Sequence, residues 1–289
     1  PDYFQLDELL TEEHKLVRDA AREWVKRAVS PIIEEACQKA VFPKELIGGL
    51  AEIGAFGPYI PTKYGGAGLD QISYGLIMQE LERGDSGVRS TASVQSSLVM
   101  YPIWKYGDEA QRKKYLPNLA SGGWIGCFGL TEPDHGSDPG SMDTKAVATK
   151  GGYILNGSKN WITNSPIADI LIIWAKDQQN ILRGFIVERS FKGLETPAIK
   201  GKFSLRASTT GMVHLSNVFI PEENKLPDVK SFKGPFSCLD SARYGIAWGV
   251  MGAAQASWLI AKDYTENRIM FNKPLASKQL IQKKLEVMQ

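Results

Sequence analysis

The feature that most constrains the fold is a residue pattern that changes twice along the chain. Up to about residue 125, apolar residues recur at helical spacing; between residues 11 and 29 they follow Thr11, which is placed to cap a helix. Further helices are predicted near residues 43–54, 73–84, 91–106 and 109–120. From about residue 126 the pattern is typical of short β-strands, and from about residue 233 it is helical again.

The middle region contains short runs rich in β-branched residues, as expected for buried strands. Residues 153–157 and 159–163 are predicted as two strands around an Asn-Gly turn, and further strands are expected at 170–174, 184–187, 212–215 and 218–220. The whole pattern predicts an α+β multidomain fold. It has an all-α N-terminal domain (residues 1–125), a β-barrel-like middle domain (126–232) and the beginning of a C-terminal helical bundle (233–289).

The C-terminal region is rich in small residues, among them Gly245, Gly249 and Gly252. Small residues let helices approach closely, and these glycines lack the strand–turn–helix setting of a dinucleotide fingerprint. We therefore interpret this region as a tightly packed helix. The last apolar residues are predicted to share one helical face with no C-cap after them, so the sequence is expected to stop inside a helix; they are Leu280, Ile281, Leu285 and Met288.

Composition argues against several classes of function. At 289 residues the chain is long enough for a large core and two or more domains. A net charge of +2 gives no field that favours nucleic acid or an anionic membrane. The cysteines fit a reducing compartment, and the histidines lack the clustering of a metal site, so no metal is expected. No apolar run reaches the roughly 18 residues of a spanning helix. A removed targeting peptide before Pro1 is left open.

Two motifs of the middle region carry the strongest functional signal. Residues 127–141 read CFGLTEPDHGSDPGS and residues 157–164 read GSKNWITN. The first offers hydroxyls, backbone donors free of side-chain bulk and a Gly-Ser turn; the second offers a tryptophan and a hydroxyl at a strand end. This ordered pair resembles the flavin-binding walls of the acyl-CoA dehydrogenases, and the helical–β–helical order is similar to that family's architecture. The weaker alternative is that both motifs are ordinary hairpins of a β-domain.

The resemblance implies an FAD site. In the family, the first segment hydrogen-bonds the edge of the isoalloxazine ring, the second covers its dimethylbenzene side, and a hydroxyl near N5 helps to hold negative charge. A later segment reaches the FAD pyrophosphate and adenosine of a neighbouring subunit, although Met270 and Asn272 stand where the family usually has glutamine and glycine. The matching residues are Phe128, Leu130, Thr131, Ser137, Trp161, Ile162 and Thr163, then Arg268, Phe271, Pro274, Leu275 and Gln279.

Longer stretches are similar to the glutaryl-CoA dehydrogenase branch of the family, at residues 80–90, 93–100, 201–208 and 242–249. In that branch the arginine matching Arg89, beside Ser90, pairs with the far carboxylate of the acyl chain, because a buried carboxylate without a partner is costly. The alternative for Arg89 is an exposed arginine on a helix. The resemblance also implies CoA contacts at Ser137, Ser237, Asp240, Arg243 and Tyr244.

The catalytic base is not found in the sequence. Removing a proton α to a thioester needs a buried carboxylate with a raised pKa. Most of the family takes it from a Tyr-Glu-Gly-like motif late in the C-terminal domain, and a minority from the position that is Ala242 here. Glu266 and Glu286 are predicted to lie on solvated helix faces. We therefore expect no catalytic residue within these residues and a base C-terminal to Gln289.

The resemblance implies FAD-dependent oxidative decarboxylation of glutaryl-CoA to crotonyl-CoA and CO2, as in lysine and tryptophan degradation, by α-proton abstraction and β-hydride transfer to flavin N5. The implied partners are glutaryl-CoA or a similar short acyl-CoA and an electron-transferring flavoprotein. A homotetramer is implied, in the bacterial cytoplasm or the mitochondrial matrix. The alternatives are another short-chain acyl-CoA dehydrogenase or oxidase, a non-decarboxylating glutaryl-CoA dehydrogenase, and a non-catalytic scaffold that binds CoA or flavin.

Overall fold

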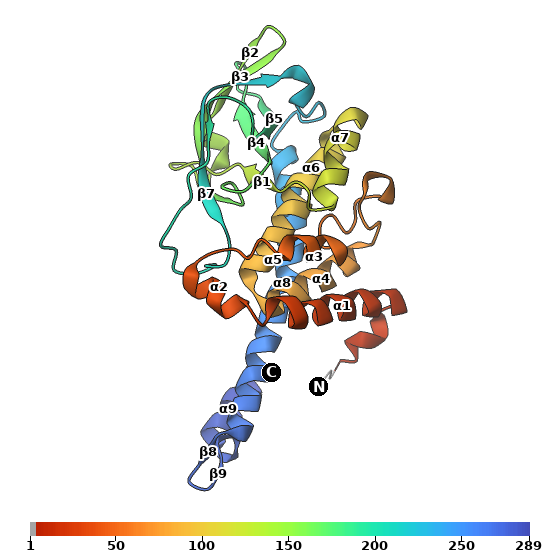
Figure 1. Cartoon of the computed structure of the whole chain (residues 1–289), viewed down its shortest axis with the longest axis vertical. Coiled ribbons are helices and arrows are strands. Elements are labelled where there is room, and N and C mark those ends of the chain that lie inside the picture. Colours follow the sequence, from red (N-terminus) through yellow and green to blue (C-terminus); the bar gives the residue numbers. More distant parts are fainter. Residues whose placement is uncertain (1–3) are drawn as a thin grey trace.

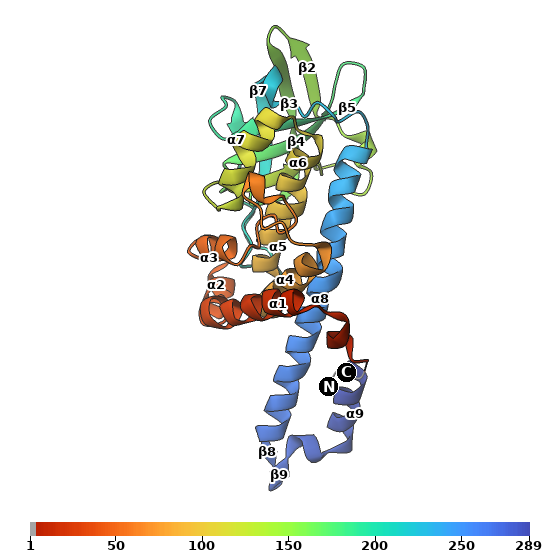
Figure 2. The ribbon, with the colours of Figure 1, turned by 90° about the vertical axis from the view of Figure 1, so that its right-hand side faces the viewer.

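The computed structural model describes residues 4–289 and shows an elongated molecule (Figure 1). A layer of helices lies in the middle, a curled sheet covers one end, and a pair of helices projects from the other end (Figure 2). The N-terminal helices are α1 (Glu12–Trp24), α2 (Ile33–Lys39), α3 (Leu46–Glu52), α4 (Gln71–Gly84), α5 (Ser86–Ser93), α6 (Tyr101–Tyr106) and α7 (Glu109–Ala120).

The predicted helices of the N-terminal region are confirmed, with changes at their ends. Thr11 caps α1, since its hydroxyl accepts a hydrogen bond of 3.2 Å from the backbone N–H of His14. The helix continues through a π-helical turn (Val25–Val29), and a second π-helical segment (Val94–Met100) joins α5 to α6. Helix α2 was not predicted, because its seven residues include none that is buried and so leave no apolar stripe to detect.

The sheet has the strand order β1-β4-β2-β3-β7-β6. The seventh strand, β5, lies outside this order and pairs with β4. Strands β1 and β4 run parallel, whereas β2–β3, β3–β7, β4–β5 and β6–β7 are antiparallel pairs. The α+β fold class with a barrel-like middle part is confirmed. The strands are β1 (Gly126–Gly129), β2 (Lys145–Thr149), β3 (Gly152–Thr163), β4 (Ile170–Lys176), β5 (Leu182–Glu188), β6 (Leu194–Glu195) and β7 (Thr210–Pro221).

The predicted Asn-Gly hairpin is wrong. Residues 152–163 form one strand, β3, which pairs with β7 over its whole length and has a register shift at Leu155/Gly157. The Asn156 side chain accepts a hydrogen bond of 2.8 Å from the Asn217 N–H in the opposite strand, so Asn156-Gly157 makes a bulge instead of a turn. The two strands predicted at 212–215 and 218–220 are likewise one strand, β7, with Asn217 in the left-handed region.

The faces of the sheet pack into different apolar cores. Phe128 and Trp174 belong to the core that also includes the N-terminal helices, whereas Cys127 and Ile173 belong to a second core on the other face. This alternation follows from the two-residue period of a strand. It places β1 at the junction of helices and sheet, where a cavity forms.

After the sheet, the long helix α8 (Lys233–Asn267) crosses the helical layer. The prediction of close packing is confirmed: a Cβ at Gly252 would overlap the backbone carbonyl of Gln79, and one at Gly245 would overlap the Tyr74 hydroxyl, both on α4. The remaining elements are β8 (Ile269–Met270), β9 (Lys273–Pro274) and α9 (Gln279–Met288).

The single apolar face predicted for α9 is only partly present. Ile281 and Leu285 are half-buried, and the Leu285 carbonyl accepts a hydrogen bond of 3.0 Å from the indole of Trp258 on α8. Leu280 and Met288 are exposed. No helix among residues 4–289 is both long enough and apolar enough to cross a membrane.

Candidate active site

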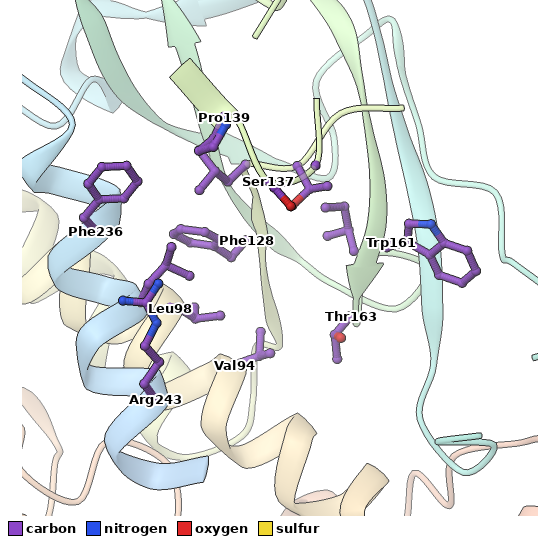
Figure 3. Close-up of a pocket in the computed structure, with 14 residues that line it drawn as sticks. Val94, Leu98, Phe128, Ser137, Pro139, Trp161, Thr163, Phe236 and Arg243 are labelled. Carbon is purple, nitrogen blue, oxygen red and sulfur yellow. The ribbon is translucent and has the colours of Figure 1, made fainter. Parts of the chain in front are cut away.

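A cavity of about 500 Å³ opens between the helices and the sheet (Figure 3). Phe236 and Arg243 reach it from α8, Val94 and Leu98 from the π-helical segment, and Phe128 from β1 (Figure 3). The loop after β1 closes one side and the end of β3 another. The full lining is Val94, Leu98, Phe128, Leu130, Thr131, Gly136, Ser137, Pro139, Trp161, Ile162, Thr163, Phe236, Leu239 and Arg243.

The helical layer fixes the position of β1. Gln95, fully buried in the π-helical segment, donates hydrogen bonds of 2.9 and 2.8 Å to the carbonyls of Leu119 and Trp124. Its side-chain oxygen accepts one of 2.8 Å from the N–H of Gly126, the first residue of β1. Because a buried amide with all partners in place has one favoured geometry, Gln95 sets where β1 and Phe128 enter the cavity.

The polar wall of the cavity consists of hydroxyl groups. Thr131 and Ser137 come from the loop after β1, and Thr163 from the end of β3. Their hydroxyls make no hydrogen bond with any residue that the structure describes, although a hydroxyl can donate and accept. Phe128, Leu130 and Ile162 form a buried apolar wall beside them. A flat aromatic ring with a polar edge fits such a pair of surfaces.

Trp161 has an unusual conformation. Its φ is 59°, in the left-handed region, and 60% of its surface is exposed. The Asn160 side chain accepts a hydrogen bond of 2.9 Å from its N–H, and the indole extends outward from the strand (Figure 3). A bulky residue in this region is rare, so the neighbouring structure must hold it there. The indole is therefore presented at the rim of the cavity.

A buried ion pair joins the two motifs of the cavity wall. The Lys159 ammonium, 0% exposed, lies 2.8 Å from a carboxylate oxygen of Glu132, which is 4% exposed. Burial lowers the pKa of Lys159 to about 8, against the opposing effect of Glu132. Burial alone would raise the pKa of Glu132, but the Lys159 charge and several hydrogen bonds outweigh it and lower the pKa to about 2.

The residues matched to CoA are only partly brought together. Ser137 and Arg243 line the cavity, and Arg243 lies 2.9 Å from Asp240 in a largely exposed ion pair. The Ser237 hydroxyl is 2.7 Å from the Tyr106 hydroxyl, and the Tyr244 ring stacks on Tyr74 at 6.3 Å. Ser237, Asp240 and Tyr244 therefore lie on α8 beside the cavity without lining it.

Arg89 is not an exposed arginine on a helix. It is 9% exposed, and its Nε donates to a carboxylate oxygen of buried Glu82, which also accepts a hydrogen bond of 2.5 Å from Ser86. Gly249 on α8 makes room for this pair, because a Cβ there would lie 2.9 Å from the Glu82 oxygen. The terminal guanidinium nitrogens make no hydrogen bond with any described residue. Neither Arg89 nor half-buried Ser90 lines the cavity; they lie on α5, less than two helical turns before cavity-lining Val94.

The segment matched to a neighbouring subunit's FAD lies far from this cavity, at the end of the α8–α9 arm (Figure 1). Arg268, Phe271 and Gln279 are all exposed there. Phe271, Leu275 and Gln279 line a second hollow of about 520 Å³. Phe271 and Asn272 have positive φ values of 53° and 60°, so the turn forms without the glycine usual in the family.

Sequence reasoning missed the helical side of the cavity. Val94, Leu98, Phe236 and Leu239 line it, but in the sequence they are ordinary apolar residues of helices. Their role depends on which helix face meets the sheet, and no local pattern reveals that. Glu132 and Lys159 carried a readable signal, since they are oppositely charged residues and one lies inside each of the two motifs.

No carboxylate lines the cavity among the described residues. Ala242 is buried on α8, and Glu266 is exposed and paired with Lys262 at 2.9 Å, as predicted for a solvated helix face; Glu286 is exposed as well. Glu132, His135 and Asp143 bring ligand atoms within 4.8 Å of one another. Because Glu132 already pairs with the Lys159 cation, this group is not a convincing metal centre.

Comparisons with known proteins agree with this geometry. Models of the N-terminal, middle and C-terminal domains of acyl-CoA dehydrogenases match residues 11–123, 127–218 and 234–289. A glutaryl-CoA dehydrogenase from Mycobacterium smegmatis, solved in complex with FADH2, is 42% identical with a TM-score of 0.96, covering 98% of this chain and 73% of its own.

Of two further relatives, one is named for a different acyl-CoA and the other is named without a specific substrate. The butyryl-CoA dehydrogenase structure from Megasphaera elsdenii is 36% identical with a TM-score of 0.92, covering 96% of this chain and 75% of its own. An acyl-CoA dehydrogenase of Bacillus subtilis is 37% identical, covering 96% of this chain and 74% of its own. The chain belongs to the acyl-CoA dehydrogenase family.

Proposed function

We propose that this protein catalyses the FAD-dependent oxidative decarboxylation of glutaryl-CoA to crotonyl-CoA and CO2. The observation that carries the proposal is Arg89, a buried cation whose Nε pairs with Glu82 while its terminal nitrogens stay available. The 42% identity to a glutaryl-CoA dehydrogenase supports the same substrate.

The cofactor is FAD. The apolar wall of Phe128, Leu130 and Ile162 suits one face of an isoalloxazine ring, and the unpaired hydroxyls of Thr131 and Thr163 suit its polar edge. When bound, FAD would accept the hydride removed from the β-carbon of the substrate. The chain's part is to hold the ring and to donate hydrogen bonds where negative charge develops.

Arg89 would select a dicarboxylic acyl chain. A guanidinium offers its donors in a planar fork, so Nε can keep Glu82 while the terminal nitrogens bind a second carboxylate. Ser90 adds a hydroxyl on the next residue, which makes no hydrogen bond with any described residue. Ser137 and Arg243, which line the cavity, would meet the CoA portion. Ser237, Asp240 and Tyr244 would follow along α8.

The catalytic base is proposed to lie C-terminal to Gln289. A base must reach the α-proton, and no described carboxylate lines the cavity. The chain covers 73% of the related glutaryl-CoA dehydrogenase, so a protein of that length has room for a further carboxylate. Electron transfer to an electron-transferring flavoprotein and a homotetramer are part of the same proposal. In the tetramer, the Arg268–Gln279 turn would approach a neighbour's FAD.

A second candidate is a short-chain acyl-CoA dehydrogenase or oxidase, favoured by the apolar side chains of Val94, Leu98 and Leu239 and by the likeness to butyryl-CoA dehydrogenase. Steady-state kinetics of the full-length protein with both thioesters separates the candidates. We expect kcat/KM to be higher for glutaryl-CoA, with no hydrogen peroxide formed. A preference for butyryl-CoA would contradict the glutaryl assignment, and peroxide release in step with turnover would indicate an oxidase.

A further inference from the structure

Lys159 is an unusual lysine because its whole side chain is buried. Beside the 2.8 Å contact with Glu132, its ammonium donates a hydrogen bond of 3.1 Å to the carbonyl of Leu130. Removing two charges from water is costly, and buried ion pairs can often be replaced by apolar residues without loss of stability. Stability alone therefore does not explain why a lysine occupies this position.

The pair connects the two walls of the cavity. Leu130 and Thr131 belong to the first motif, and Lys159 lies on β3 just before Trp161 in the second. Lys159 contacts Leu130, and the next backbone N–H, of Asn160, donates a hydrogen bond of 2.9 Å to the carbonyl of Thr131. The two walls are thus joined directly behind the residues that line the cavity.

Glu132 also closes the loop that carries Ser137. Its carboxylate accepts hydrogen bonds of 2.6 Å from the N–H of Asp143 and 3.0 Å from the N–H of Thr144, and it accepts one from the Thr144 hydroxyl as well. Residues 133–142 therefore begin and end at the same carboxylate. Ser137 makes no hydrogen bond to another described residue, so its loop is held by this closure and by the hydrogen bonds of His135 to Glu132 and Asp143.

The backbone makes room for the lysine. A Cβ at Gly129 on β1 would lie 3.1 Å from Cγ of Lys159 and 2.6 Å from Cδ1 of Ile173, so the Lys159 stem passes where β1 has no side chain. The sulfur of Met142 lies 4.0 Å from the ammonium. The space is fitted to an extended lysine between β1 and the closed loop.

We infer that Lys159 and Glu132 are positioning residues for the flavin: they fix the two walls and the Ser137 loop at the separation that the isoalloxazine ring requires. This inference rests on the proposed function, because it takes FAD as the occupant of the cavity. The pair does not touch the reacting atoms. Its effect is on how tightly the ring is held and how it is oriented.

The inference is tested by a double-mutant cycle in the full-length protein with Lys159→Met, Glu132→Gln and both changes together. Each single change leaves one buried group without its partner, so we expect a lower melting temperature of the apoprotein and a weaker Kd for FAD. The double variant removes both charges, and its melting temperature should recover. Its FAD affinity should remain about 10- to 100-fold weaker than wild type, because the walls are no longer fixed.

The visible spectrum of bound FAD gives a readout that stability does not move, and the fine structure of its bands should weaken in the double variant. Lys114→Met is the matched control. It removes a Lys–Glu pair of 2.7 Å between α7 and β5, away from the cavity lining, and should leave the FAD affinity and spectrum unchanged. Thr144→Val, which keeps both charges, should weaken FAD binding less than either charge variant.

Full recovery of FAD affinity and spectrum in the double variant would show that the pair is purely structural and would overturn the inference. Unchanged FAD binding in both single variants would overturn it too. Failure of the wild-type protein to bind FAD would instead contradict the proposed function, and the inference with it. The two failures are thus distinguished by the wild-type titration.

Discussion

Arg89 is a buried arginine whose Nε pairs with Glu82. The resemblance to glutaryl-CoA dehydrogenases implied that Arg89 meets the acyl chain, and the structure buries its guanidinium on α5. It did not indicate Glu82 as its partner, although both residues lie in one of the stretches similar to glutaryl-CoA dehydrogenases. Their contact depends on the break between α4 and α5 at Asp85, which turns the two helices toward each other.

Replacing Arg89 with alanine should reduce activity selectively. Removing one partner of a pair in a water-poor site costs about 2–5 kcal/mol, which corresponds to a loss of roughly 30- to 4,000-fold in kcat/KM for glutaryl-CoA. Activity on butyryl-CoA, which has no distal charge, should fall much less. Arg112→Ala on α7 is a control for the loss of a partly buried arginine, because the Arg112 guanidinium donates a hydrogen bond of 2.8 Å to the Trp104 carbonyl. Equal losses on both substrates would mean that Arg89 only holds Glu82 and the helices.

The stability that Glu132 contributes is expected to depend on pH. Its pKa is lowered from 4.5 to about 2 in the folded state, so the stability it contributes is fully present above pH 4.5 and is lost as the pH falls toward 2. The melting temperature of wild type should therefore fall more steeply between pH 5 and pH 3, across about the upper half of this window, than that of Glu132→Gln. Parallel curves for the two proteins would show that Glu132 is not held as a carboxylate.

At the scale of elements, the local residue pattern predicted most helices and strands. It did not predict that two pairs of expected strands are each one continuous strand. An Asn-Gly pair usually indicates a tight turn, yet Asn156-Gly157 continues β3 through a bulge. The partner that decides this, Asn217, lies far along the chain in β7. The close packing predicted from the glycines of α8 is confirmed, because a Cβ at Gly245 or Gly252 would overlap atoms of α4.

Gly252→Ala should destabilise the contact between α4 and α8. The added methyl group would overlap the Gln79 carbonyl, so one helix must shift, at a cost of about 1–3 kcal/mol. Gly48→Ala in α3 is a matched control, because a Cβ there meets nothing within 4 Å; it should be neutral or stabilise by about 0.5–1 kcal/mol. Denaturant unfolding of both variants measures the difference. Equal effects would argue against tight packing along α8.

At the scale of the whole molecule, the sheet and the helical layer share one apolar core, and the α8–α9 arm extends away from both (Figure 2). The cavity lies where these layers meet, so its flavin wall, which comes from two continuous motifs, could be predicted. Its helical wall could not, since Val94 and Phe236 come together only through tertiary packing. Neither wall contributes a carboxylate among the described residues, so the proposed catalytic base belongs to neither.

A polypeptide of residues 1–289 should therefore bind substrate without oxidising it. No described carboxylate reaches the cavity, so the α-proton has no acceptor. After reconstitution with FAD, adding glutaryl-CoA under anaerobic conditions should leave the flavin absorbance unbleached, while the full-length protein bleaches. Bleaching of the 289-residue polypeptide at a comparable rate would show that one of its own residues is the base.

The proposed reaction oxidises and then decarboxylates glutaryl-CoA. The most direct measurement is mass spectrometry of the thioester formed by the full-length protein from glutaryl-CoA and an artificial electron acceptor, with the released CO2 measured alongside. We expect crotonyl-CoA and an equal amount of CO2. Accumulation of glutaconyl-CoA without CO2, or no oxidation of glutaryl-CoA while butyryl-CoA is consumed, would contradict it.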